Sequence, residues 1–112
     1  MIEIPNWAQV IIDAHKAVAG SAVSHAGRLK SDRYFVWQED FLDQDDVSDD
    51  EHDSEAVSGS TDLYTKREFD PWIRQIEAEF KKDDRILWSK DGMTFEPDTG
   101  FFHFSWEWTV IV

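Results

Sequence analysis

The spacing of apolar residues along the chain predicts two amphipathic helices. Near the N-terminus, apolar residues recur at helical intervals over residues 7–18, with Asn6 expected as the N-terminal cap and Gly20 as the stop. A second helix is expected after Asp70 and Pro71, because aspartate can cap a helix and proline suits the first helical position. The stripe expected to be buried on this helix consists of Trp72, Ile73, Ile76 and Phe80.

The other apolar runs predict strands. RYFVWQ, which begins at Arg33, is apolar on both alternating faces, as is typical of a central strand. Ser58–Ser60 is expected to be a flexible turn, followed by a possible short strand at residues 63–64. ILWS and MTFE are expected to be separate strands joined by a turn at residues 91–92, and the run FFHFSWEWTVIV is expected to follow a turn at EPDTG.

The final run alternates so regularly that it predicts a half-buried antiparallel strand. One face carries Phe102, Phe104, Trp106, Trp108, Val110 and Val112, and the other carries His103, Ser105, Glu107 and Thr109. The aromatic face needs a cover, which the two helical stripes can supply. The sequence therefore predicts an α+β fold: a single domain over residues 1–112, with an antiparallel sheet ending in a three-stranded meander and two helices packed on one face.

Negative charge is concentrated in one segment. The chain has a formal net charge of −13, and the window from Glu39 to Glu55 contains ten acids and no Lys or Arg. The rest of the chain carries the other fourteen of the 24 acids against eleven bases, so the charge is a local feature. The acids of the window are Glu39, Asp40, Asp43, Asp45, Asp46, Asp49, Asp50, Glu51, Asp53 and Glu55. We expect an acidic loop at about residues 39–60.

The composition indicates a folded protein of a reducing compartment. The chain has 112 residues, six of them Trp, which is too aromatic for a disordered polypeptide. It has no cysteine, so neither a disulfide framework nor a thiolate metal site is expected, and a cytoplasmic location is favoured. The N-terminal apolar run is interrupted by charged residues and makes a poor signal peptide, and no stretch is long and apolar enough for a membrane span.

Catalytic and metal-binding motifs are missing from the sequence. The four histidines, His15, His25, His52 and His103, include no pair with the helical spacing of a zinc site. His103 is expected to be a surface partner of Glu107 or Ser105. There is no G-x-S-x-G elbow and no glycine-rich phosphate loop. We therefore expect a protein that is not an enzyme and has no cofactor.

Calcium is the strongest metal alternative, because clustered carboxylates suit a hard cation. An EF-hand loop starting at Asp43 would have Val47 at its fifth position, Ser48 at the glycine turn and Ser54 in place of the bidentate glutamate. The motif fails at its most diagnostic positions. A calcium-binding module remains an alternative function, as does a structural interaction domain whose acidic loop only confers solubility.

Three segments, DPWIRQIEAEF, ILWSKDG and DTGFFHFSWEW, resemble the immunity proteins of bacterial toxin–immunity pairs. Those of contact-dependent growth inhibition and the YezG-like antitoxins are the most similar in style, and the resemblance spans roughly Phe69 to Trp108. It implies a protein that binds one cognate toxin domain, often a nuclease, and neutralises it.

The charge of the acidic window leads to the same class of partner. A dense negative field attracts basic surfaces and repels nucleic acid, so we expect neither direct nucleic-acid binding nor a membrane partner. Domains that grip nucleic acid, nucleases above all, have basic working surfaces. The ten acids are therefore the predicted partner-binding residues, acting by steering and by pairing with Lys and Arg. A DNA-mimic inhibitor of a nucleic-acid-binding protein is the main alternative.

Overall fold

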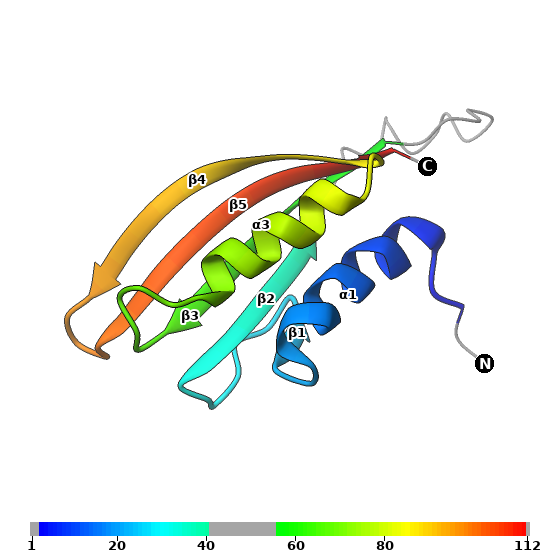
Figure 1. Cartoon of the computed structure of the whole chain (residues 1–112). Helices are drawn as coiled ribbons and strands as arrows, with labels where there is room; N and C mark the ends of the chain where they lie inside the picture. The colour runs from blue at the N-terminus through cyan, green and yellow to red at the C-terminus, as the bar shows by residue number, and fades with distance from the viewer. Residues whose placement is uncertain (1–2, 41–55, 112) are drawn as a thin grey trace.

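The structure, a computed structural model, describes residues 3–40 and 56–111. In chain order, these residues form α1 (Asn6–Ala19), β1 (Val23–His25), β2 (Arg33–Glu39), β3 (Ala56–Thr65), α3 (Trp72–Lys82), β4 (Ile86–Glu96) and β5 (Phe101–Ile111). The five strands make one sheet in the order β1-β2-β3-β5-β4. Only β1 and β2 pair in parallel, and the other described neighbours are antiparallel. Both helices lie on the same face of the sheet (Figure 1), so the predicted α+β fold is confirmed.

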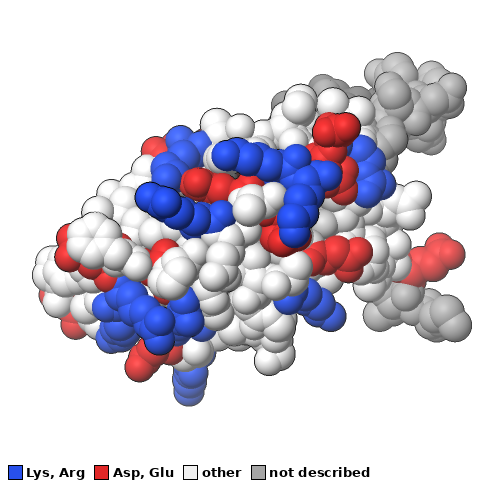
Figure 2. Space-filling model, viewed as in Figure 1, with Lys and Arg blue, Asp and Glu red and all other residues white. Residues whose placement is uncertain are grey.

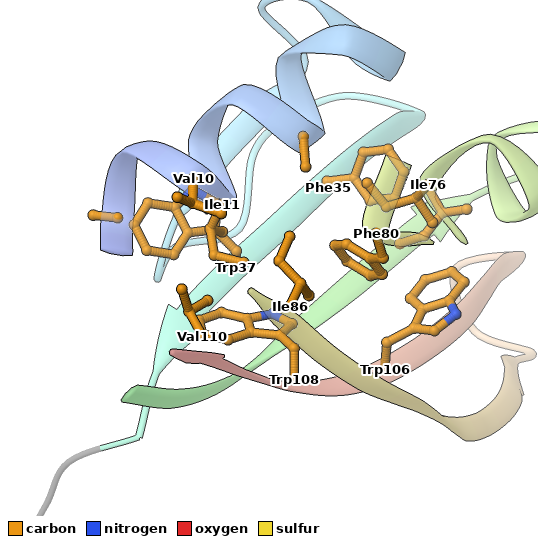
Figure 3. Close-up of a cluster of buried hydrophobic side chains, with 13 residues drawn as sticks. Val10, Ile11, Phe35, Trp37, Ile76, Phe80, Ile86, Trp106, Trp108 and Val110 are labelled. Atoms are coloured by element: carbon orange, nitrogen blue, oxygen red, sulfur yellow. The ribbon is translucent and has the colours of Figure 1, made fainter. Parts of the chain in front are cut away.

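The core lies between the two helices and the sheet. Its largest fully buried side chains come from several elements and include Ile11, Phe35, Phe80, Trp106 and Trp108. Figure 3 shows these side chains meeting in the space that the helices cover. Burying each large side chain of this kind stabilises the fold by about 1.5–3 kcal/mol. The alternation predicted for the last strand is confirmed for its described residues, and Val112 lies outside them.

The predicted meander is wrong, because ILWS and MTFE belong to one strand. β4 runs without a break from Ile86 to Glu96, and the expected turn at residues 91–92 is a bulge in its pairing with β5. Gly92 has a φ of 153°, which suits glycine and lets the strand absorb an extra residue. The C-terminal part is therefore a two-stranded hairpin, and β5 lies in the interior of the sheet between β3 and β4.

The turn predicted at Ser58–Ser60 is also wrong, because these residues lie within the ten-residue strand β3. Gly59 faces the helices and lies opposite Trp108 in the register. A Cβ atom at position 59 would lie 2.3 Å from the carbonyl oxygen of Gln38 and 2.4 Å from the Trp108 ring. Glycine is needed here for close packing rather than for a turn.

The predicted helix boundaries are largely confirmed. Gly20, with a φ of 62°, ends α1, and its amide donates to the Lys16 carbonyl. The N-terminal cap of α1 is Pro5 rather than Asn6, which is the first helical residue. At the start of α3, the cap position is Pro71 rather than Asp70, and helix residues begin at Trp72. The Asp70 carboxylate still accepts a hydrogen bond from the Trp72 amide at 2.9 Å.

His15, on α1, is fully buried. Its Nδ1 lies 2.7 Å from the Ile11 carbonyl oxygen, which can only accept, so Nδ1 carries the proton. Nε2 therefore accepts from the Thr61 hydroxyl at 2.9 Å, and the same hydroxyl accepts from the Trp108 indole at 2.9 Å. Burial lowers the pKa of His15 to about 4, although the backbone hydrogen bond opposes the shift.

Candidate functional site

The two faces of the sheet differ in what covers them and in charge. α1 and α3 pack on one face (Figure 1), and we call the other the helix-free face. The central strands β3 and β5 contain no Lys or Arg. Their outward side chains are Ser58, Ser60, Asp62 and Tyr64 on β3 and Phe101, His103, Ser105, Glu107, Thr109 and Ile111 on β5. This face is therefore rich in hydroxyl and carboxylate groups.

One end of the helix-free face is closed by an aromatic ladder. The Tyr34 and Tyr64 rings stack at 5.3 Å, and the Tyr64 and His103 rings stack at 4.4 Å. The Arg28 guanidinium lies 4.0 Å from the centre of the Tyr64 ring and donates to the Tyr34 hydroxyl at 3.1 Å. Burial raises the pKa of the Tyr64 hydroxyl, and the charge of Asp62 adds to the shift. The aromatic side chains at this end of the face therefore make their contacts within the fold.

In the middle of the face, Asp62, His103 and Ser105 form a cluster that resembles a catalytic triad in composition only. Asp62 Oδ1 lies 2.7 Å from His103 Nε2 and accepts from the Ser105 hydroxyl at 2.7 Å. The Ser105 hydroxyl lies 3.3 Å from the same His103 nitrogen. A triad needs the serine and the aspartate on different imidazole nitrogens, so this geometry does not activate the serine as a nucleophile.

The sequence anticipated this cluster only in part. Ser105 was one of the two partners expected for His103, and the contact is present, but the shorter contact is to Asp62. Asp62 was missed because β3 was expected to begin only near residue 63. The signal was available in the alternation of Ser58, Ser60 and Asp62 with inward-facing residues.

The other end of the face is acidic. Asp40 and Glu107 are exposed and line a hollow of about 400 Å³, together with Ser58, Ser89 and Thr109 among others. Within residues 3–40 and 56–111, no Lys, Arg or His forms an ion pair with either carboxylate. The Asp40 amide donates to the Ser58 carbonyl at 2.8 Å, which continues the pairing of β2 with β3. Two carboxylates thus lie at this end, Glu107 on β5 and Asp40 directly after β2.

The predicted partner-binding residues fall into three groups. Asp40 lies at the acidic end of the helix-free face, as just described. Glu39 is half-buried and lies 2.7 Å from His25 Nε2. Burial alone would raise the pKa of Glu39, but hydrogen bonds from His25 and from its own backbone amide outweigh it and hold the pKa below its usual value. Asp43, Asp45, Asp46, Asp49, Asp50, Glu51, Asp53 and Glu55 lie outside the described residues.

Basic side chains are prominent on the helix side of the molecule. On the helix side, Lys and Arg gather in clusters interspersed with acids (Figure 2). Arg74, Lys81 and Lys82 belong to α3, and the ion pairs there include Lys82 with Glu79 and Lys90 with Glu77. Because eight of the 24 acids lie in residues 41–55, the described part holds sixteen acids and eleven bases.

In residues 3–40 and 56–111, no helix is long and apolar enough to cross a membrane. The same residues contain no group of three or more His, Cys, Asp or Glu that could hold a metal ion. No protein-family model matches the sequence, and no curated protein matches it either. Function is therefore inferred from the chemistry of the two faces.

Proposed function

We propose that this protein is a non-catalytic inhibitor of the immunity type, which binds the basic surface of a cognate toxin domain in the cytoplasm of the producing bacterium. The observation that carries the proposal is the segregation of charge. Eight acids fall within residues 41–55, and the residues that flank this segment lead into the end of the sheet where Asp40 and Glu107 have no basic partner among the described residues.

The physical advantage of this arrangement is fast capture. Opposite charge on two surfaces raises association rates toward roughly 10⁸–10⁹ M⁻¹s⁻¹ at low salt. A nuclease domain is the best-matched partner, because it must carry a basic surface to hold its phosphate-rich substrate. The same negative field repels nucleic acid, which argues against direct binding of DNA or RNA by this protein.

An inhibitory role agrees better with the helix-free face than an enzymatic one. In the cluster of Asp62, His103 and Ser105, the His103 Nε2 proton is directed to the Asp62 carboxylate, so the imidazole is not placed to take the serine proton. The described lining of the hollow beside Asp40 and Glu107 offers carboxylates and hydroxyls, and among these described residues no nucleophile is paired with a base. Such a surface is suited to pairing with Lys and Arg side chains.

The first experiment is capture of the partner from the native host, with the bound protein identified by mass spectrometry. Recovery of a basic toxin domain, followed by inhibition of its activity at equimolar inhibitor, is the expected result. A DNA-mimic inhibitor would instead bind several unrelated nucleic-acid-binding proteins with similar affinity. If no protein with a basic surface is retained, the proposed function is wrong.

The second experiment measures steering with a matched control. Asn replaces Asp45, Asp46, Asp49 and Asp50 in the test variant, and amides replace Asp32, Glu68, Asp84 and Asp98, four exposed acids elsewhere, in the control. The test variant should associate at least about tenfold more slowly at low salt, with dissociation little changed. Its rate should also depend less on salt, since the Debye length falls from about 30 Å at 0.01 M to about 8 Å at 0.15 M. Stopped-flow salt slopes that are equal for test variant and control would show that these acids do not steer.

A further inference from the structure

The strand β4 is an unusually exposed edge of the sheet. It has eleven residues and only β5 as a neighbour among the described strands, whereas β1 at the opposite edge has three residues. Three of its large apolar side chains remain exposed, Leu87 at 55%, Met93 at 50% and Phe95 at 49%. Natural sheets usually shorten, cover, bulge or charge such an edge, because its unpaired backbone groups are a template for another strand. β4 has a charge and a bulge at residues 90–92, whereas residues 93–95 have neither.

The backbone register shows which groups of β4 point outward. The Ile111 amide donates to the carbonyl of the residue just before β4, at 2.9 Å. Backbone groups of a strand alternate between its two neighbours, so His103, an even number of residues away, also bonds toward β4. Its register partner Thr94 returns that bond. The amides and carbonyls of Met93 and Phe95, on either side of Thr94, are therefore directed to the free edge.

The side chains along this edge differ between the two faces. On the helix side, Met93 and Phe95 stand next to the aromatic residues of β5, with the Phe95 and Phe102 rings 4.7 Å apart. On the helix-free face, the small Ser89 lies between the edge and the exposed Glu107. Strands lie about 4.8 Å apart, so a Lys or Arg on an added strand could reach over Ser89 to the Glu107 carboxylate.

We propose that β4 receives an extended segment of the partner protein as a sixth strand of the sheet. The segment has apolar side chains toward Met93 and Phe95, and Lys or Arg on the face shared with Glu107. Main-chain hydrogen bonds supply affinity in this mode of recognition, and the alternating side chains supply specificity. That the segment comes from a toxin domain rests on the proposed function. The argument that β4 can pair with an added strand does not depend on it. A second copy of this chain is the weaker occupant, because both copies carry a net charge of −13.

The test uses a synthetic peptide of alternating valine and lysine, with the length of β4, and the full-length protein. Amide hydrogen exchange is measured by NMR with and without the peptide. The amides of Met93 and Phe95 should exchange at least about tenfold more slowly in the complex, while Thr94, already bonded to β5, should not change. A peptide of the same composition with its valines and lysines in separate blocks should give no protection. Equal protection by both peptides, or none by either, would overturn the proposal.

Amino-acid variants distinguish the contribution of backbone hydrogen bonds to peptide binding from that of charge. Met93→Pro removes an outward amide and should weaken peptide binding about tenfold, whereas Met93→Thr keeps the amide and should weaken it less than about threefold. Glu107→Gln should weaken binding and reduce its salt dependence. Thermal melts identify any variant that fails to fold, and the exchange measurement on the wild type does not depend on them. Equal affinity of the proline and threonine variants would contradict strand addition.

Two further outcomes are informative. Sedimentation equilibrium of the protein alone should show a monomer, and a dimer with protected Met93 and Phe95 amides would assign the edge to a second copy and overturn the proposal. A captured toxin domain that binds without protecting these amides would also overturn it, while leaving the proposed function intact. Conversely, protection by the alternating peptide supports strand addition even if no basic toxin is captured. Failure to capture a basic toxin would contradict the proposed function alone.

Discussion

Replacing Gly59 with alanine should destabilise the fold although it adds only one methyl group. Gly59 lies in the interior of β3, with Glu39 as its register partner on one side and Trp108 on the other. The added Cβ would lie 2.3 Å from the Gln38 carbonyl oxygen and 2.4 Å from the Trp108 ring. Neither neighbour can give way easily, because the carbonyl is backbone and Trp108 is only 2% exposed.

The size of the effect follows from these contacts. Overpacking of a well-packed core typically costs about 1–3 kcal/mol. Displacing the indole also strains its hydrogen bond to Thr61, whose net contribution is about 0.5–1.5 kcal/mol. Alanine also lowers the conformational entropy of the unfolded chain, which offsets about 0.4–1 kcal/mol of this destabilisation. We therefore expect a loss of about 2 kcal/mol, with about 4 kcal/mol as the upper bound, and a melting temperature lower by roughly 8 °C for a chain of this size.

Urea denaturation of the wild type and two variants measures the effect. Gly27→Ala is the matched control, because the nearest atom to its added Cβ is Ser24 Oγ at an ordinary contact distance of 3.8 Å. Its free energy of unfolding should stay within about 0.5 kcal/mol of the wild type. If Gly59→Ala stays within the same limit, as a residue in a flexible turn would, the packing of β3 beneath Trp108 is wrong.

Two more predictions concern buried polar groups. The pKa of His15 is about 4 in the folded state and 6.5 in the unfolded state, so the unfolded chain binds a proton first as the pH falls. Lowering the pH from 7 to 4.5 should therefore reduce the free energy of unfolding by about 2.5 kcal/mol through this site. His15→Gln should flatten that part of the pH dependence in urea titrations, and an unchanged slope would contradict the assignment. Asp70→Ala should reduce stability in thermal melts by about 3 kcal/mol, because it leaves the Arg33 guanidinium without its carboxylate and removes the hydrogen bond to the Trp72 amide at the start of α3. The control Asp84→Ala, at an exposed position, should reduce it by less than about 0.5 kcal/mol. Equal melting temperatures for the two aspartate variants would refute this role of Asp70.

The elements that could be predicted from sequence are those whose signals are local. The start of α3 is encoded by Asp70 and Pro71 next to each other, and the last strand by strict alternation over residues 102–110. Packing partners distant in sequence determine the elements that were missed. Ser58–Ser60 has the composition of a turn, and only the Trp108 ring explains why glycine stands inside a strand.

The candidate site was predictable in charge but not in geometry. Composition alone identified the acidic window, of which the described residues are Glu39 and Asp40. Whether a carboxylate meets a base depends on strand register, which places Glu39 beside His25 and Asp62 beside His103 and leaves Glu107 on the open face. Register is set by the pairing of whole strands, so no short motif in the sequence reports it.

The hydrogen bond from the Asp40 amide to the Ser58 carbonyl has a consequence for how such a protein can evolve. It extends the β2–β3 pairing as far as Asp40, so the chain enters and leaves residues 41–55 from two strands that are already paired. Doubling the length of a connection costs only about 0.6 kcal/mol in chain entropy. We therefore expect changes of length or sequence between the two strands to leave the strand pairing in place. Under the proposed function, changes confined to these residues would alter recognition of a toxin partner while the fold is kept.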